Sequence, residues 1–365
     1  MKSLRQHQQL LLSCVSLGLM ALPSVGFVTV TSVARADKIG TGVQRPTTPS
    51  FPATPPPPGR EPLPGERNLQ ERSLEIDYRV NNLLADFRGN LWVGSWRGLS
   101  RINPNTGNIL ARVSLPNLAI GALAEDQQGR LWVGTYEGLK QVDPATNEIT
   151  TQNLLLPSKR VLSLLVDRRG FLWTGTDNGL ALIRPENGTI ITTLKSLPGV
   201  SGNAMTLDAE GQLWVGTLDG LVRVNTASAL IMQRIQQLPG TTVQTLAISP
   251  QGLIWAGMPN QLLVINPTTS EVLRSVTPLR GRNVTAVRFA QDGSVWVGTD
   301  NGLLRLNPHN GAVLDEVAGL PSSRVLALAP DIGNKLWIGT REGLAWLMPT
   351  STSANPHLAF TRAVE

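Results

Sequence analysis

Aspartates that recur at one distance from a tryptophan are the first candidates for chemistry. An Asp stands six residues before a Trp five times, at Asp86, Asp126, Asp167, Asp208 and Asp331. Such a series of carboxylates could form a ring of calcium sites, because calcium prefers oxygen ligands. The alternative role is structural, since an Asp that begins a turn accepts hydrogen bonds from nearby backbone amides. Ser249 and Ala290 replace the Asp in two further copies, so the structural role is favoured.

Histidine and cysteine residues offer little chemistry in this sequence. The three histidines, His7, His309 and His357, are far apart along the chain, and the only cysteine is Cys14. This pattern contains no His/Cys metal constellation and permits no disulfide framework. The sequence also lacks a nucleophile elbow, a phosphate-binding glycine loop and a metal-binding helix pair. We therefore predict a protein without catalytic residues, bound metal or cofactor.

Arginines and aromatic residues at repeated distances from the tryptophans form the strongest set of candidates. Some stand thirteen or fourteen residues before a Trp, and others stand four or five residues after one. The candidates for ligand or partner binding are Arg79, Trp96, Arg97, Tyr136, Lys159, Arg160, Arg282, Asn283, Arg324 and Arg341. Arg pairs with carboxylate or phosphate in bidentate geometry, and Arg and aromatic residues dominate many interfaces. This set predicts a protein, glycan or small anionic ligand as the partner.

The elements that must position these residues follow from a sequence repeat. Its anchoring tryptophans are spaced by 40 residues once and then by 41 residues five times, at Trp92, Trp132, Trp173, Trp214, Trp255, Trp296 and Trp337. The phrase Leu91–Ser95 recurs as Leu131–Thr135, and it degenerates only in the fifth copy, Ile254–Met258. Self-similarity at a fixed period of this length predicts a stacked or radial repeat architecture.

Each repeat divides into four short strands. In the sixth copy they are expected at 283–289, 295–299, 303–306 and 312–317, with Gly- and Asn-containing turns between them. Four antiparallel strands form one propeller blade, and no helical periodicity is present. We predict an all-β, seven-bladed β-propeller of four-stranded blades over residues 68–349, with each anchoring Trp buried between blades.

Ring closure leaves two alternatives open. Residues 68–74 align with 108–114 by their distance to the next Trp, so the N-terminal segment is expected to supply the outer strand of the last blade. The other alternative is a strand at 357–364 in the C-terminal tail, residues 350–365, after an enlarged turn at 350–356.

The propeller geometry would gather the candidate cations on one face. In propellers, the loop that leads into the innermost strand and the turn between the second and third strands share a face. Blades six, seven, one and two are neighbours in a closed ring, and blade three adds Lys159 and Arg160. The alternative is that these cations are solvated rim charges balanced by nearby acids, namely Glu137, Asp177, Asp219, Asp300 and Glu342.

The N-terminus has the pattern of a secretory signal over residues 1–36. Lys2 and Arg5 precede an apolar stretch from Leu10 to about Val33, and Ala34-Arg35-Ala36 predicts cleavage after Ala36. The alternative is an uncleaved membrane anchor, because the apolar stretch is long enough to span a bilayer. Residues 37–67 are rich in proline and predict an extended, disordered linker. We expect a periplasmic or secreted protein.

Net charge limits the choice of partner. The formal charge is +6, but Lys2, Arg5 and Arg35 contribute three of these charges and no acid lies in the first 36 residues. A net charge of +3 on the remainder does not indicate a nucleic-acid-binding protein. We predict a monomer that does not bind nucleic acid and that contacts a membrane only through an uncleaved signal segment.

The stretch from Asp126 to Leu139, DQQGRLWVGTYEGL, resembles the two-component regulator propeller repeat. The resemblance covers all seven repeats, residues 68–349. It implies an extracytoplasmic domain of the kind that serves as the sensor of a membrane histidine kinase. No second apolar span and no kinase follow the propeller in this sequence, so we expect a non-enzymatic binding domain whose signalling output lies in a separate protein. The repeat is also similar to the propellers of streptogramin lyases, which use histidine and a divalent metal. His309 and His357 do not match that arrangement, so the lyase-like alternative, like that of an envelope scaffold, is the weaker one.

Overall fold

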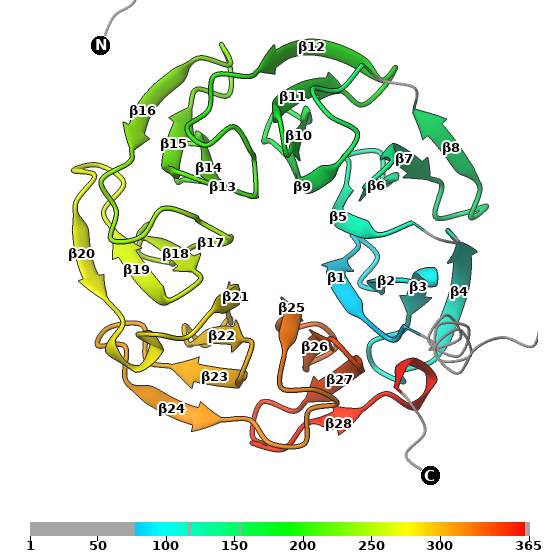
Figure 1. The fold of residues 1–365 in the computed structure, drawn as a ribbon. Coiled ribbons are helices and arrows are strands. Elements are labelled where there is room, and N and C mark those ends of the chain that lie inside the picture. The colour runs from blue at the N-terminus through cyan, green and yellow to red at the C-terminus, as the bar shows by residue number, and fades with distance from the viewer. Residues whose placement is uncertain (1–76, 116–117, 153–154, 362–365) are drawn as a thin grey trace, which may run out of the picture. The chain divides into compact units, whose positions relative to one another are not determined.

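The computed structural model describes residues 77–115, 118–152 and 155–361. Its strands form seven antiparallel four-stranded sheets that surround a common centre as a ring (Figure 1). The predicted seven-bladed, all-β propeller is therefore confirmed. The predicted signal peptide and linker, and the first residues of the predicted propeller, lie outside the described residues.

Consecutive strands form each blade, with the first strand innermost. Blades 1 to 3 consist of β1 (Val80–Ala85), β2 (Leu91–Ser95), β3 (Gly98–Ile102), β4 (Ile109–Ser114), β5 (Ile120–Glu125), β6 (Leu131–Thr135), β7 (Gly138–Val142), β8 (Ile149–Gln152), β9 (Val161–Val166), β10 (Leu172–Thr176), β11 (Gly179–Arg184) and β12 (Thr189–Leu194). Blades 4 and 5 consist of β13 (Ala204–Leu207), β14 (Leu213–Thr217), β15 (Gly220–Val224), β16 (Ile231–Ile235), β17 (Thr245–Ile248), β18 (Ile254–Met258), β19 (Gln261–Ile265) and β20 (Val272–Ser275).

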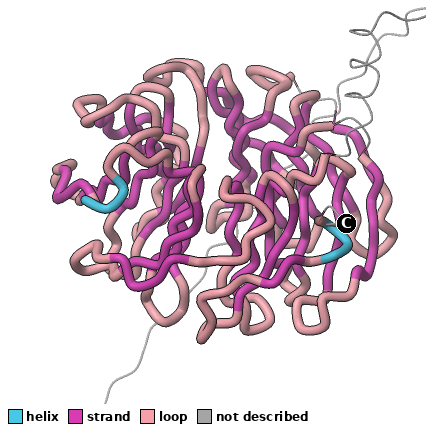
Figure 2. Tube along the Cα trace, turned by 60° about the horizontal axis from the view of Figure 1, so that its bottom comes forward, coloured by secondary structure: helices cyan, strands magenta, loops and turns pink. Residues whose placement is uncertain are grey.

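Blades 6 and 7 complete the ring. They consist of β21 (Val284–Phe289), β22 (Val295–Thr299), β23 (Gly302–Leu306), β24 (Val313–Glu316), β25 (Val325–Ala329), β26 (Leu336–Thr340), β27 (Gly343–Leu347) and β28 (Asn355–Pro356). The strands of blade 6 agree with their predicted bounds to within one residue at each end. Two short 3-10 helices, η1 (Thr277–Leu279) and η2 (Leu358–Phe360), interrupt the strands and turns (Figure 2). Neither helix of the described segments is long and apolar enough to cross a membrane.

The anchoring tryptophans hold neighbouring blades together. Each is at most 5% exposed, and each belongs to an apolar cluster shared with the next blade. Trp92 packs with Ile120 and Leu131 of blade 2, and Trp337 packs with Val80 of blade 1 across the closure of the ring. The predicted burial between blades is confirmed, and it is the main apolar contact along the ring.

The glycine two residues after each anchoring Trp permits this close approach. A Cβ atom on Gly134 would lie 2.4 Å from Cγ1 of Val161, at the start of the innermost strand of blade 3. A side chain at this position would push the two blades apart. The repeat therefore keeps this glycine for packing.

The recurring aspartates have the structural role that the sequence favours. Oδ2 of Asp126 accepts a hydrogen bond from Nε1 of Trp132 at 2.8 Å, and Oδ1 accepts from the backbone amides of Gln128 and Arg130. Asp86, Asp167 and Asp208 accept from their own tryptophans in the same way. Asp331 differs, because Trp337 donates to the carbonyl of Ile332 instead. Four of the five carboxylates thus accept a hydrogen bond from the Trp of their own blade.

The C-terminal tail supplies the fourth strand of the last blade. β28 pairs with β27, with Pro356 opposite Ala345 and Asn355 opposite Trp346. The favoured N-terminal segment, 68–74, lies outside the described residues, and the strand of the other alternative lies at 355–356 instead of 357–364. The blade therefore extends beyond residue 349, and the position expected for the N-terminal strand is occupied by the tail.

Candidate functional site

The two sets of loops that carry the candidate residues meet on one face of the ring. In blade 7 the amide of Arg341 donates to the carbonyl of Arg324 at 3.0 Å, and in blade 2 the amide of Tyr136 donates to the carbonyl of Ala119 at 3.2 Å. Equivalent bonds join Asp300 to Asn283 and Asp177 to Arg160. In these four blades the loop into the innermost strand is therefore bonded to the turn between the second and third strands.

Arg79 in blade 1 lies at the centre of the group. Its Nε donates to Oδ2 of Asp77 at 2.8 Å, and its amide donates to Oδ1 at 2.9 Å. Its guanidinium carbon lies 6.0 Å from the centre of the Trp96 ring, within the range of a cation–π contact. Arg79 thus contacts both an acid and an exposed aromatic side chain.

The charges around Asp77 connect blades 7 and 1. Partial burial opposes ionisation of this carboxyl, but hydrogen bonds from Arg79 and the charges of Arg79 and Arg341 lower its pKa. Arg341 therefore acts on Asp77 from the neighbouring blade. The hydrogen bonds of Asp77 likewise raise the pKa of Arg79 against the effect of burial, with a further contribution from Tyr136.

Tyr136 and Arg160 extend the group to blades 2 and 3. The guanidinium carbon of Arg160 lies 4.5 Å from the centre of the Tyr136 ring. Tyr136 is 46% exposed and Trp96 is 39% exposed, so both rings present a free surface. We call the set Asp77, Arg79, Trp96, Tyr136, Arg160 and Arg341 the loop-face cluster.

The side chains of the remaining candidates make no contact with this cluster among the described residues, although the carbonyl of Arg324 accepts from the amide of Arg341. Lys159 and Arg324 are exposed. Nη1 of Arg282 and Oδ1 of Asn283 are buried on blade 6 and lack a hydrogen-bond partner among the described residues. Arg97 contacts Tyr78, with 6.0 Å between its guanidinium carbon and the ring centre.

The acids expected to balance these cations do not pair with them. Among the ion pairs of the described segments, Arg79 is the only candidate that takes part, and its partner is Asp77. Sequence reasoning missed Asp77, although its position two residues before Arg79 suits a local side-chain-to-backbone hydrogen bond. The cations of the face therefore keep most of their charge available.

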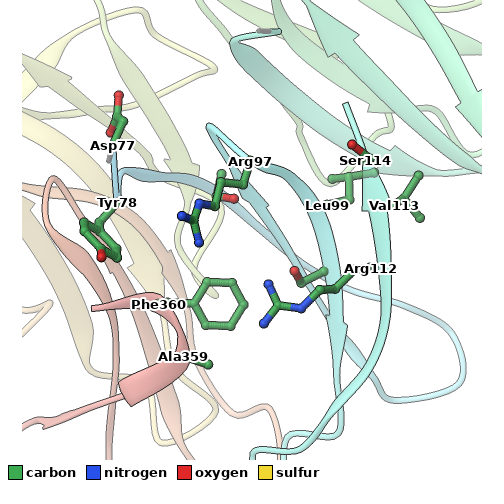
Figure 3. Close-up of a pocket in the computed structure, with 11 residues that line it drawn as sticks. Asp77, Tyr78, Arg97, Leu99, Arg112, Val113, Ser114, Ala359 and Phe360 are labelled. Carbon is green, nitrogen blue, oxygen red and sulfur yellow. The ribbon is translucent and has the colours of Figure 1, made fainter. Parts of the chain in front are cut away.

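A cavity of about 230 Å³ adjoins the cluster where blade 7 meets blade 1 (Figure 3). Asp77 and Tyr78 line it from the segment before β1, Arg97 and Arg112 from blade 1, and Phe360 from the tail. We call it the seam pocket. Arg112 and Phe360 were not among the predicted residues, because the repeat alone does not show that the tail folds against blade 1.

No group of three or more His, Cys, Asp and Glu side chains that could hold a metal occurs among the described residues. His309 lies in the turn between β23 and β24, where its carbonyl accepts a hydrogen bond from Arg274. His357 follows β28, and its Nε2 lies 2.8 Å from the carbonyl oxygen of Gly107 in blade 1. The two histidines thus have separate surroundings in the fold.

Comparison with solved structures identifies the same architecture in several proteins. The extracellular domain of a putative hybrid two-component system from B. thetaiotaomicron is 19% identical with a TM-score of 0.63, over 74% of this chain and 40% of that one. A streptogramin B lyase is 16% identical with a TM-score of 0.63, over 75% and 95%. The virginiamycin B lyase of Staphylococcus aureus is 16% identical with a TM-score of 0.55, over 67% and 85%. Identities this low show only that the folds are similar. The chain spans about two fifths of the length of the B. thetaiotaomicron protein.

Sequence comparison gives a match to one family model. No curated protein matches the chain. The model of the two component regulator propeller matches residues 114–137 and 155–178, which include β5–β6 of blade 2 and β9–β10 of blade 3. The predicted resemblance to this repeat is confirmed in these two stretches, and the fold of the chain is a seven-bladed β-propeller.

Proposed function

We propose that this protein is an extracytoplasmic, sensor-type binding propeller without enzymatic activity, and that it recognises an anionic partner through the loop-face cluster. The observation that carries the proposal is that the loops of blades 7, 1, 2 and 3 present three arginines and two exposed aromatic rings, of which only Arg79 is paired with an acid, Asp77. Surfaces of Arg and aromatic residues supply most of the free energy in many interfaces.

Electrostatics favour an acidic partner over a neutral one. Asp77 neutralises only Arg79, while Arg160 and Arg341 form no ion pair among the described residues. Arg160 is preorganised by its contact with Tyr136 and can still present its guanidinium edge to a carboxylate or phosphate. Binding of this kind weakens as salt screens the charges.

The family and the fold support the sensor-type assignment. The two-component regulator propeller repeats, together with the shared architecture of an extracellular two-component domain, are consistent with a recognition role. We propose that the signalling output resides in a separate protein. A propeller that binds through its loops can vary them without disturbing the sheets.

A capture experiment tests the proposal. The mature protein is immobilised, incubated with an envelope extract at low salt, and its bound partners are identified and then measured individually. Arg160→Ala combined with Arg341→Ala should weaken binding at least about tenfold, corresponding to about 1.4 kcal/mol, and rising salt should weaken binding of the parent protein. The matched control combines Arg88→Ala with Arg234→Ala, which removes two exposed charges from other parts of the ring.

Two results would contradict the proposal. If the folded Arg160→Ala/Arg341→Ala variant bound the captured partner as tightly as the parent protein does, the loop-face cluster would not be the binding site. Turnover of a streptogramin B substrate in the presence of magnesium would contradict the assignment as a non-enzymatic protein.

A further inference from the structure

The seam pocket combines the two ends of the propeller. Blade 1 contributes Ser100 and Arg112, the turn after β2 contributes Arg97, and the tail contributes Phe360. Both guanidinium groups point towards the ring of Phe360, and Tyr78 lies across from them (Figure 3). The pocket therefore exists only where the tail has closed the ring.

The two arginines of the pocket lack an acidic partner. The guanidinium carbon of Arg112 lies 5.9 Å from the ring centre of Phe360, and that of Arg97 lies 6.0 Å from the ring centre of Tyr78. Neither takes part in an ion pair within the described segments. The one acid in the lining, Asp77, is already bonded to Arg79. An oxyanion that enters the pocket would thus meet two available guanidinium groups.

Comparison with the other blades shows that the fold does not require these residues. The place of Arg97 is taken in the other blades by acids and amides, namely Glu137, Asn178, Asp219, Asn260, Asn301 and Glu342. The residue at the repeat position of Ser100 is apolar in five of the other six blades, namely Ala181, Val222, Leu263, Leu304 and Ala345. A residue needed only for packing would follow the repeat. Ser100 is instead a polar side chain, 5% exposed, in a seam that is elsewhere mostly apolar.

We propose that the seam pocket is a binding site for a compact, hydroxylated molecule that carries one oxyanion group. Arg97 and Arg112 hold the oxyanion, Phe360 and Tyr78 pack against the carbon skeleton, and Ser100 and Ser114 bond to hydroxyl groups. The volume of about 230 Å³ lies below the range of about 300–1,000 Å³ for drug-sized ligands, which favours a small polyol acid or phosphate. This site shares Asp77 with the loop-face cluster but uses different arginines, and it does not depend on the function proposed for that cluster.

Occupancy of the pocket has a consequence for the ring. The ligand would contact blade 1 and the tail together, and a ligand that binds only the folded state raises its stability. Binding should therefore raise the melting temperature as well as release measurable heat. A variant that keeps the fold but fills the pocket should lose both signals.

Calorimetry and thermal unfolding of the full mature chain test this site with four probes at millimolar concentration. Glucuronate carries a carboxylate on a polyol ring, glucose 6-phosphate carries a phosphate, glucose carries no charge, and inorganic sulfate carries no polyol. We expect at least one of the two charged sugars to bind and to raise the melting temperature, and which of them binds more tightly distinguishes a carboxylate from a phosphate ligand. Glucose and sulfate should bind at least about tenfold more weakly.

Three variants locate the site. Arg112→Gln and Arg97→Gln should each weaken binding of the charged sugar about tenfold or more. Arg234→Gln is the matched control, because Arg234 lies opposite Val222 in blade 4 as Arg112 lies opposite Ser100 in blade 1. Ser100→Val introduces the residue that blade 4 has at this place, so it should abolish binding while the protein remains as stable as the parent.

Several outcomes would overturn the proposal. Failure of both charged sugars to bind would do so, as would equal binding of glucose or sulfate, or unchanged affinity in the folded Arg112→Gln and Ser100→Val variants. The Arg160→Ala/Arg341→Ala variant should still bind the charged sugar, and Arg112→Gln should still capture the macromolecular partner. The two proposals can therefore fail independently.

Discussion

At the scale of single residues, tryptophans in this chain have two different roles. Trp214 is fully buried, packs against blade 5 and donates to Asp208 at 3.0 Å, whereas Trp96 lies in an exposed turn. Trp214→Ala should lower the free energy of unfolding by about 3–5 kcal/mol, because it leaves a cavity between two blades. Trp96→Ala should change it by less than about 0.5 kcal/mol.

Chemical denaturation followed by circular dichroism measures both changes. Asp208→Asn offers a further control, since it keeps the volume of the side chain while weakening the hydrogen bond to the indole. Similar, small losses of stability for Trp214→Ala and Trp96→Ala would contradict the role of the repeated Trp as the link between blades.

The sequence repeat predicted the packing residues directly, whereas the binding residues stay a prediction. The period placed each Trp and its Gly correctly, because their contacts recur in every blade, and it placed the Asp that bonds to Trp in four blades. Asp77 and Arg112 have no such recurrence, so their contacts with Arg79 and Phe360 became visible only in the folded chain. Departures from the repeat, such as Arg97 and Ser100, were the remaining signal in the sequence.

At the scale of elements, the tail replaces the end of a regular fourth strand. In blades 3 and 4, Leu194 and Ile235 stand fifteen residues after Gly179 and Gly220 and cover the third strand. The same distance from Gly343 leads to Leu358, which is 87% exposed, whereas Phe360 is 6% exposed. Because of the turn of η2, the apolar side chain that covers the third strand comes two residues later in the sequence than in blades 3 and 4. A strict repeat period could not predict this shift.

Closure by the tail makes a prediction about stability. Deletion of residues 351–365 would remove β28 and Phe360, uncover Leu344 and Trp337, and leave β27 with an unpaired edge. We expect a lower melting temperature and a tendency to associate, because an exposed strand edge can pair with another chain. Calorimetry and size-exclusion chromatography measure these effects.

Three further measurements test whether the tail strand itself accounts for the expected loss of stability. Deletion of residues 362–365 alone should have little effect, because it retains every contact described for the tail. Phe360→Ala should cost about 3–5 kcal/mol, and Leu358→Ala should cost much less. A larger loss of stability on deletion of residues 66–75 than on deletion of 351–365 would instead favour closure by the N-terminal segment.

At the scale of the whole molecule, the sequence predicted the ring in more detail than the contacts on its surface. Seven copies of one phrase determine seven similar sheets, and a sheet with two apolar faces requires a neighbour on each side. The loop face is different, since its chemistry depends on which loops become adjacent across blades 7, 1 and 2. Closure brings Arg341 towards Asp77 although 264 residues separate them in the sequence.

Export of the whole chain is the last prediction. Lys2 and Arg5 before an apolar stretch, followed by Ala34-Arg35-Ala36, are typical of a secretory signal with cleavage after Ala36. The mature protein should then begin at Asp37 and carry no cysteine, because Cys14 lies in the removed segment. N-terminal sequencing of protein from the extracytoplasmic fraction should find Asp37, and Ala36→Leu should block processing by placing a large residue at the cleavage site. Recovery of an intact Met1 on a membrane-bound form would show instead that the segment is kept as an anchor.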